Sequence, residues 1–129
     1  MSLLRATGDE FDPESFLRES TLHPCNVFHK GSRRSEKSVG ETSGITVPTS
    51  GAEMDQFEKQ VEDSLEFLRS NQAELSRLKS FEGVEELRLD FGVSRKDLFG
   101  QYQFLPPELV SLAGQLGLGL EVSIYGTDE

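Results

Sequence analysis

The sequence predicts an α+β fold, with an antiparallel or mixed sheet that carries one long and two shorter helices on one face, related to the ferredoxin-like β-α-β-β-α-β arrangement. Three observations indicate this fold. A long amphipathic pattern occupies the middle of the chain, short apolar or alternating segments flank it, and two further helix starts each lead into such a segment. The 129 residues suit a single domain, spanning residues 1–129.

The stretch from Ser50 to Gly83 predicts one long helix. Ser50 and Glu53 have the spacing of a capping box, and Gly83 is a residue type that commonly ends a helix. The apolar residues between them recur at steps of three and four, which places them on one helical face. They are Met54, Phe57, Val61, Leu65, Leu68, Leu75 and Leu78. We expect this face to be buried against a sheet of the same chain.

Shorter segments predict the remaining elements. Strands are indicated at residues 2–7, 27–28, 45–47, 87–91, 101–105 and 118–125. Pro48 is expected to end the third of these strands. Proline at the first helical position predicts one helix that starts at Asp12 and Pro13, and another that starts at Pro106 and Pro107.

The composition indicates an acidic protein surface. Lys and Arg number 13 against 23 Asp and Glu, which gives a formal net charge of -10. Such a surface repels nucleic acid and anionic lipid, whereas it suits a basic protein partner. No apolar run approaches the roughly 20 residues needed to span a bilayer. Because neither a secretory leader nor a second cysteine beside Cys25 is seen, we expect a cytoplasmic protein.

His23, Cys25 and His29 form the one cluster of metal-ligand residue types in the sequence. Zinc commonly takes four protein ligands, or three and a water, and no fourth ligand other than a carboxylate is evident. In an extended strand His23 and His29 lie about 20 Å apart, too far for one ion to bridge. A metal site is therefore the disfavoured interpretation, and no cofactor is expected.

Residues 30–44 are rich in Ser, Gly and charge, which predicts an exposed and flexible polar loop. Lys30, Arg33, Arg34 and Lys37 cluster there in a chain that is otherwise acidic. Because an arginine offers a planar fork of donors, this cluster is a candidate site for a carboxylate or a phosphate. A solvated loop without a ligand is the simpler interpretation.

No recognisable catalytic set is present, which favours a protein that is not an enzyme. The chain lacks a nucleophile elbow, a phosphate-binding loop and the serine, histidine and aspartate order of a triad. Gly114, Gly117 and Gly119 follow a predicted helix and precede a strand, the reverse of a dinucleotide-binding loop. Catalysis by carboxylates stays open, because such pairs are recognised by their geometry.

The ordered set of features resembles the bacterial domain-of-unknown-function family 4279. The features are a short strand before Gly8, the helix start from Asp12 to Glu14, Pro24 followed by Phe28, Lys30 and Gly31, the long middle helix, the strand around Leu87, and the stretch from Leu105 to Tyr125. Family members usually carry a tryptophan in the strand where this chain has Ile45 to Val47. The resemblance implies an α+β domain and a short stand-alone protein, with no established activity and no catalytic residue to carry over.

Two hypotheses about function follow. Small size, negative charge and the lack of a catalytic set favour a protein-binding module, of an immunity or regulatory type, with a basic partner. The alternative is a small-molecule sensor or enzyme that uses residues 23–37 around a pocket.

Overall fold

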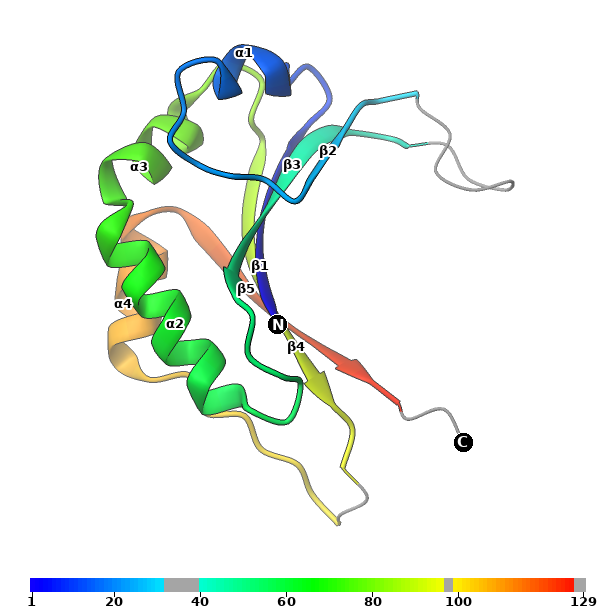
Figure 1. The fold of residues 1–129 in the computed structure, drawn as a ribbon, viewed down its shortest axis with the longest axis vertical. Coiled ribbons are helices and arrows are strands. Elements are labelled where there is room, and N and C mark those ends of the chain that lie inside the picture. Colours follow the sequence, from blue (N-terminus) through cyan, green and yellow to red (C-terminus); the bar gives the residue numbers. More distant parts are fainter. Residues whose placement is uncertain (32–39, 97–98, 127–129) are drawn as a thin grey trace.

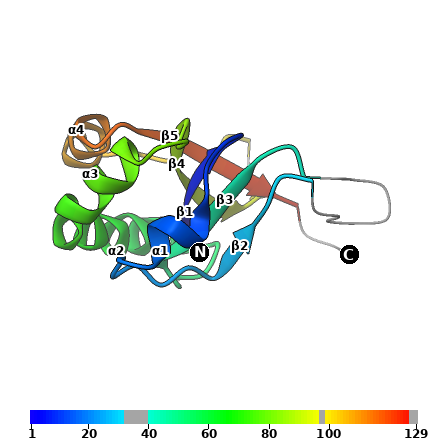
Figure 2. The same cartoon turned by 90° about the horizontal axis from the view of Figure 1, so that it is seen from above.

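The computed structural model describes residues 1–31, 40–96 and 99–126, built around one five-stranded sheet. Along the chain the elements are β1 (Ser2–Gly8), α1 (Pro13–Leu17), β2 (Asn26–Phe28), β3 (Ser43–Ser50), α2 (Phe57–Ser70), α3 (Gln72–Ser80), β4 (Glu86–Ser94), α4 (Pro107–Gln115) and β5 (Leu118–Tyr125). Figure 1 and Figure 2 show α2, α3 and α4 together on one side of the sheet, with α1 at one end of that layer. None of the described helices is both long and apolar enough to cross a membrane.

The sheet is mixed, with the strand order β2-β3-β1-β4-β5. The central strand β1 pairs antiparallel with both β3 and β4, whereas β5 pairs parallel with β4. The α4 helix makes the crossover that a parallel connection requires. From β1 to β4 the element order is ferredoxin-like, with α2 and α3 together in the place of the second helix. The α+β fold with a mixed sheet is thus confirmed.

The core lies between the sheet and the helices. Leu4 and Ala6 of β1 are fully buried on the helical side, beside Leu87 of β4. The apolar face predicted for the middle of the chain is buried from Val61 onward, while Met54 is 43% exposed. Burying one such aliphatic side chain stabilises the fold by about 1.5–3 kcal/mol. The helices are therefore held mainly by this packing.

The middle segment is helical, but it forms two helices. Asn71 ends α2 and precedes α3, with backbone angles of φ -124° and ψ 23°. Its side-chain amide donates to the carbonyl of Phe67 at 2.8 Å. This bond replaces the backbone N–H that would pair with that carbonyl in a continuous helix. The apolar stripe continues across the break, so Leu75 and Leu78 of α3 are buried as expected.

The predicted helix start at Ser50 is wrong, because β3 extends to this residue and α2 begins only after Gln56. The Ser50 hydroxyl donates to Asp63 at 2.7 Å and accepts from the Ala52 N–H at 3.1 Å. The N–H of Glu53 donates to the side-chain oxygen of Gln56 at 2.9 Å. A turn therefore takes the place of the predicted capping box.

Gly83 lies in the turn into β4 rather than at the end of a helix, since α3 ends at Ser80. Its φ of 91° is a conformation that residues with a side chain rarely adopt. A Cβ on Gly8 would overlap the Gly83 carbonyl. Both glycines are thus needed where the end of β1 meets this turn.

The strand end predicted at Pro48 is wrong. Pro48 does not end its strand, because β3 continues to Ser50 with an irregular register beside Ser2 and Leu3. The short edge strand β2 pairs with β3 only as far as Thr46. The missing N–H of the proline therefore interrupts no hydrogen bond on that side.

Candidate functional site

The candidate metal ligands His23, Cys25 and His29 are all exposed. The ring of His29 contacts both carboxylate oxygens of Glu14 through Nε2, at 2.9 and 3.0 Å. Within residues 1–31, 40–96 and 99–126, no three His, Cys, Asp or Glu side chains are grouped so that they could hold a metal ion. These residues are therefore placed as surface groups, and one of them, His29, contacts a carboxylate.

The candidate anion site falls largely outside the described residues. Arg33, Arg34 and Lys37 lie there, together with most of the predicted flexible loop. Lys30 is exposed, and its backbone N–H donates to the Ser43 hydroxyl at 2.8 Å. The predicted loop boundary at residue 44 is wrong, because β3 begins at Ser43 and is buried there.

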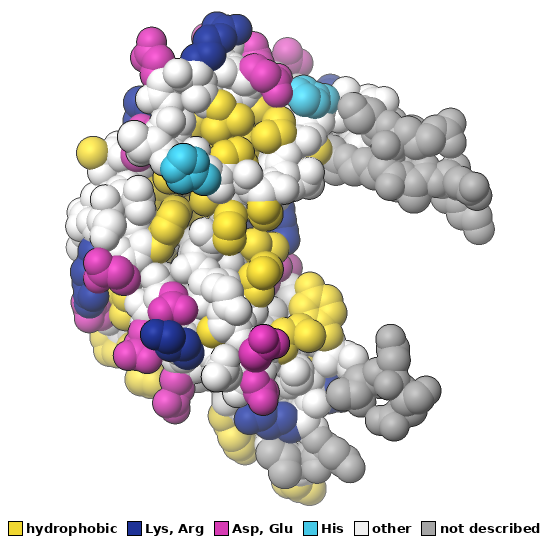
Figure 3. All heavy atoms as spheres, viewed as in Figure 1, with side chains coloured by type: hydrophobic (Ala, Val, Ile, Leu, Met, Phe, Trp, Pro, Cys, Tyr) yellow, Lys and Arg dark blue, Asp and Glu magenta, His cyan; other side chains and the backbone are white. Residues whose placement is uncertain are grey.

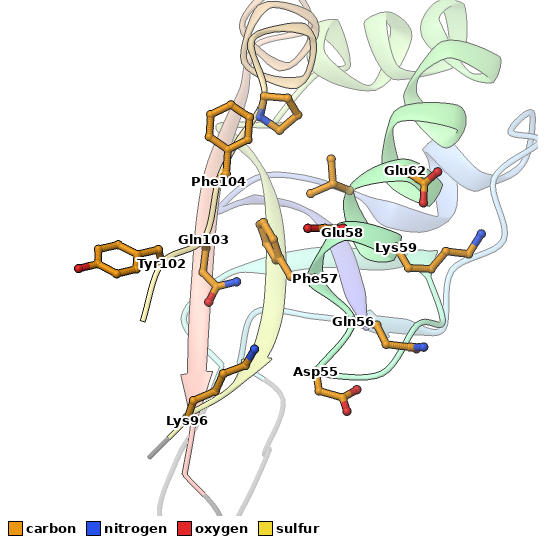
Figure 4. A pocket seen from close by; sticks show the side chains of 12 residues that line it. Asp55, Gln56, Phe57, Glu58, Lys59, Glu62, Lys96, Tyr102, Gln103 and Phe104 are labelled. Atoms are coloured by element: carbon orange, nitrogen blue, oxygen red, sulfur yellow. The ribbon is translucent and has the colours of Figure 1, made fainter. Parts of the chain in front are cut away.

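A groove, which we call the α2 groove, lies between the first half of α2 and the segment that leads into α4. Its volume is about 660 Å³. Figure 4 shows Phe57 of α2 near its centre, with Tyr102, Gln103 and Phe104 on one side and Glu62 on the other. Two parts of the chain that are distant in sequence thus form its walls.

Three aromatic side chains are exposed along the segment before α4. Phe99, Tyr102 and Phe104 are 112%, 90% and 74% exposed, whereas Phe16 and Phe91 of the core are fully buried. Tyr102 and Phe104 also line the α2 groove. Large apolar side chains that gather on a protein surface commonly mark a contact with another molecule. This segment is therefore the strongest candidate for a binding surface.

The same segment is not a strand, so the strand predicted at residues 101–105 is wrong. The Gln101 side chain donates to the Ser94 carbonyl at 2.8 Å and accepts from the Lys96 N–H at 3.0 Å. These two bonds hold the segment against the end of β4 without a ladder of backbone hydrogen bonds. Because no described strand pairs with the segment, its aromatic side chains are left in solvent.

Carboxylates dominate the charge around the α2 groove. The charged residues that line it are Asp55, Glu58, Glu62, Lys59 and Lys96. Lys59 forms an ion pair with Asp63 at 3.1 Å, which neutralises its charge. The Ser50 hydroxyl, followed by Lys59, lowers the pKa of Asp63. Figure 3 shows Asp and Glu side chains gathered over α2, so the aromatic surface lies beside an excess of negative charge.

The three carboxylates of the groove do not form a paired acid and base. Asp55, Glu58 and Glu62 are directed to different sides in Figure 4 rather than toward one point. Acid–base catalysis needs both groups within reach of the same reacting molecule. Neither of the two described histidines lines the groove. The arrangement therefore suits the binding of cationic groups better than it suits a reaction.

The sequence did not predict this groove, because the two segments that form its walls are brought together only by the fold. The alternation of Tyr102 and Phe104 with glutamines predicts a strand, and Glu58 and Glu62 indicate a solvated helix face. A signal was nevertheless present, since three aromatic residues fall within a short stretch that is otherwise polar at residues 99–104. The two prolines that follow it disfavour strand pairing there.

The chain matches a known protein family. The model of the family described as Domain of unknown function (DUF4279) matches residues 2–127, nearly the whole chain. No curated protein and no solved structure matches the chain. The resemblance indicated by the sequence is therefore confirmed.

Proposed function

Because the chain belongs to the DUF4279 family, whose description names no activity, we propose from the geometry that it is a non-catalytic protein-binding module. The partner is a basic protein, and the module is of an immunity or regulatory type. The α2 groove and the exposed aromatic side chains beside it form the contact surface. A bacterial cytoplasm suits this proposal, since the exposed Cys25 has no second cysteine for a disulfide.

The observation that carries the proposal is the exposure of Phe99, Tyr102 and Phe104. Aromatic side chains are enriched among the residues that contribute most to binding free energy at protein interfaces. Covering them with a partner gains about 25 cal/mol for each Å² of apolar surface removed from water. The Tyr102 hydroxyl can form a hydrogen bond with the partner at the same time.

The charge of the chain selects the kind of partner. Asp55, Glu58 and Glu62 lie next to the aromatic side chains, in a chain with a formal net charge of -10. An Arg or Lys side chain of the partner can lie between a carboxylate and an aromatic face, where the cation–π contact contributes about 0.5–2 kcal/mol. Attraction at longer range speeds association and weakens as the ionic strength rises.

Affinity capture at moderate salt tests the proposal, with the full chain as bait in a lysate of the source organism. We expect a basic protein bound in a one-to-one ratio and released as the salt concentration rises. The double substitution Tyr102→Ala with Phe104→Ala should then weaken binding of that purified protein. Each truncation at the centre of an interface costs about 1–2 kcal/mol, roughly tenfold in affinity.

Val110→Ala provides the matched control. Val110 is an apolar residue of α4 that is 49% exposed and does not line the α2 groove. Its truncation should leave the affinity unchanged. An acidic partner, or equal binding by the double variant and the control, would contradict the proposal. A co-purified metabolite without any protein partner would instead favour a small-molecule sensor or enzyme that uses residues 23–37.

A further inference from the structure

The two edges of the sheet differ in how they are protected against pairing with another chain. One edge strand, β2, has only three residues, whereas β5 at the other edge has eight (Figure 1). Proteins protect long edges with proline, charged side chains and above all lysine, a bulge or a covering segment. β5 contains neither proline nor lysine, and its register with β4 is continuous from Leu118 to Tyr125. Its one charged residue is Glu121, so the edge repels an acidic strand but not a basic one.

Within the described part of the chain, no strand pairs with the backbone groups on the outer side of β5. In a parallel pair, alternate residues of a strand direct their N–H and C=O groups to the neighbour, and the residues between them direct these groups away. The end of β5 is also exposed, at 53% for Ile124 and 51% for Tyr125. The edge thus offers both hydrogen bonds and apolar surface to an extended chain.

The side chains of β5 on the two faces of the sheet determine which residues an added strand would contact. Val122 pairs with Phe91, which is fully buried under the helices, so Val122 belongs to the helical side of the sheet. Ile124, two residues on, continues that apolar row into solvent. Glu121 belongs to the open face of the sheet, where Asp90 is its neighbour in β4. An added strand would therefore lie beside apolar residues on one face and polar residues on the other.

On the open face beside β5, three carboxylates contact two guanidinium groups. Arg88 contacts Glu86 at 2.7 Å and Glu121 at 3.1 Å, so two carboxylates share one guanidinium. Arg5 and Asp90 pair with each other at 3.4 Å. One carboxylate charge of this group is thus left over, next to the edge.

We propose that β5 accepts an extended segment of a partner protein as an additional strand. In this segment apolar residues, placed beside Val122 and Ile124, alternate with basic residues placed beside Glu121. A second copy of the chain suits the edge less well. The net charge of -10 on each copy opposes association, and a symmetric antiparallel pair would place both Glu121 side chains on the same face. The inference rests on the proposed function only for the charge of the partner, because it concerns a surface separate from the α2 groove.

A synthetic peptide of alternating Lys and Val residues, blocked at both ends, serves as the probe. We expect it to bind the full chain and to slow amide hydrogen–deuterium exchange in β5 but not in β2. One control peptide has the same composition with all lysines before all valines, and another carries N-methyl groups on alternate amides. Both should bind roughly tenfold more weakly or worse, because neither matches both the alternation and the backbone hydrogen bonds.

Substitutions in the chain test whether the peptide binds at the β5 edge. Ile124→Lys places a cation on the edge and should weaken binding of the alternating peptide roughly tenfold. Val110→Lys adds the same charge on α4 at a similar exposure, 49% against 53%, and should leave binding unchanged. Slowed exchange in β5 should persist in the variant Tyr102→Ala with Phe104→Ala, because this readout reports on the edge and not on the α2 groove. It therefore separates failure of this inference from failure of the proposed function.

Three results would overturn the inference. They are equal binding of all three peptides, slowed exchange in β2 rather than β5, and a dimer in sedimentation experiments that Ile124→Lys dissociates. The last result would assign the edge to a second copy of the chain.

Discussion

At the scale of single residues, a buried group of three hydroxyls joins β1, β3 and α2. The oxygens of Ser2 and Thr49 lie 2.8 Å apart, those of Ser2 and Ser64 2.8 Å, and those of Thr49 and Ser64 2.9 Å. Each hydroxyl can donate one hydrogen bond and accept others, so the three can satisfy one another. No local pattern predicts this group, since its members are far apart in the sequence.

Thr49→Val tests this group, because it keeps the side-chain shape and removes one hydroxyl. One of the two remaining hydroxyls then loses its acceptor, so the free energy of unfolding should fall by about 1–2 kcal/mol. Urea denaturation measures the change. Thr7→Val, at a half-buried position of β1, is the control and should change stability by less than about 0.5 kcal/mol. Equal losses in both variants would show that the three hydroxyls do not act together.

A second prediction concerns Glu74 of α3 and the pH dependence of stability. Arg77 donates to the Glu74 carboxylate at 2.8 and 3.2 Å, and to the carbonyl of Phe16 at 3.0 Å. The hydrogen bond from Arg77 is the main cause that lowers the pKa of Glu74 below its usual 4.5. Because the folded state has the lower pKa, the ionised carboxylate stabilises the fold above pH 4.5, and this contribution is lost as the pH falls through the folded-state pKa.

We therefore expect Glu74→Gln to be less stable than the natural chain at neutral pH and to approach it in acid. Thermal unfolding of both proteins between about pH 7 and pH 3 measures this difference. A difference in stability between the two proteins that stays constant over the whole pH range would contradict the role given to the ionised Glu74.

At the scale of elements, the apolar patterns whose residues are buried in the fold predicted the structure best. The apolar stripe of the middle helices and the alternation in β4 are confirmed, because each follows the period of its element. Three of the errors fall where a side-chain hydrogen bond sets the local structure. Asn71 divides the helix, Gln101 holds a predicted strand away from the sheet, and Ser50 bonds Asp63 instead of capping a helix.

The helix break gives a third prediction. Asn71→Ala removes the donor to the Phe67 carbonyl, and it should lower the free energy of unfolding by about 1 kcal/mol. Alanine has the higher intrinsic helix propensity, so propensity alone would give the opposite sign. Gln72→Ala, at the exposed first residue of α3, is the control and should be near neutral. A gain in stability for Asn71→Ala would mean that packing alone sets the break.

At the scale of the whole molecule, the arrangement of layers decides which surfaces can bind. The helices of the described chain cover one face of the sheet, and the α2 groove lies where that layer meets the segment before α4. The negative charge could be predicted from the composition, and the basic partner that we propose rests on it. The position of the α2 groove could not be predicted, because Phe57 and Phe104, which both line it, are brought to the same groove only by the tertiary fold.

The salt dependence of partner binding decides whether the α2 groove binds a basic protein. The dissociation constant of the captured protein would be measured by titration calorimetry at several salt concentrations. Three proteins would be compared: the natural chain, the charge variant Asp55→Asn with Glu58→Gln, and the aromatic variant Tyr102→Ala with Phe104→Ala. Because salt screens charges but not apolar contacts, the two variants should respond differently.

We expect the charge variant to bind roughly tenfold more weakly than the natural chain at low salt. This difference should shrink as the salt concentration rises toward about 1 M, where charges farther apart than about 3 Å are screened. The aromatic variant should bind more weakly at every salt concentration. If both variants bind the partner as tightly as the natural chain at low salt, the α2 groove is not the binding surface.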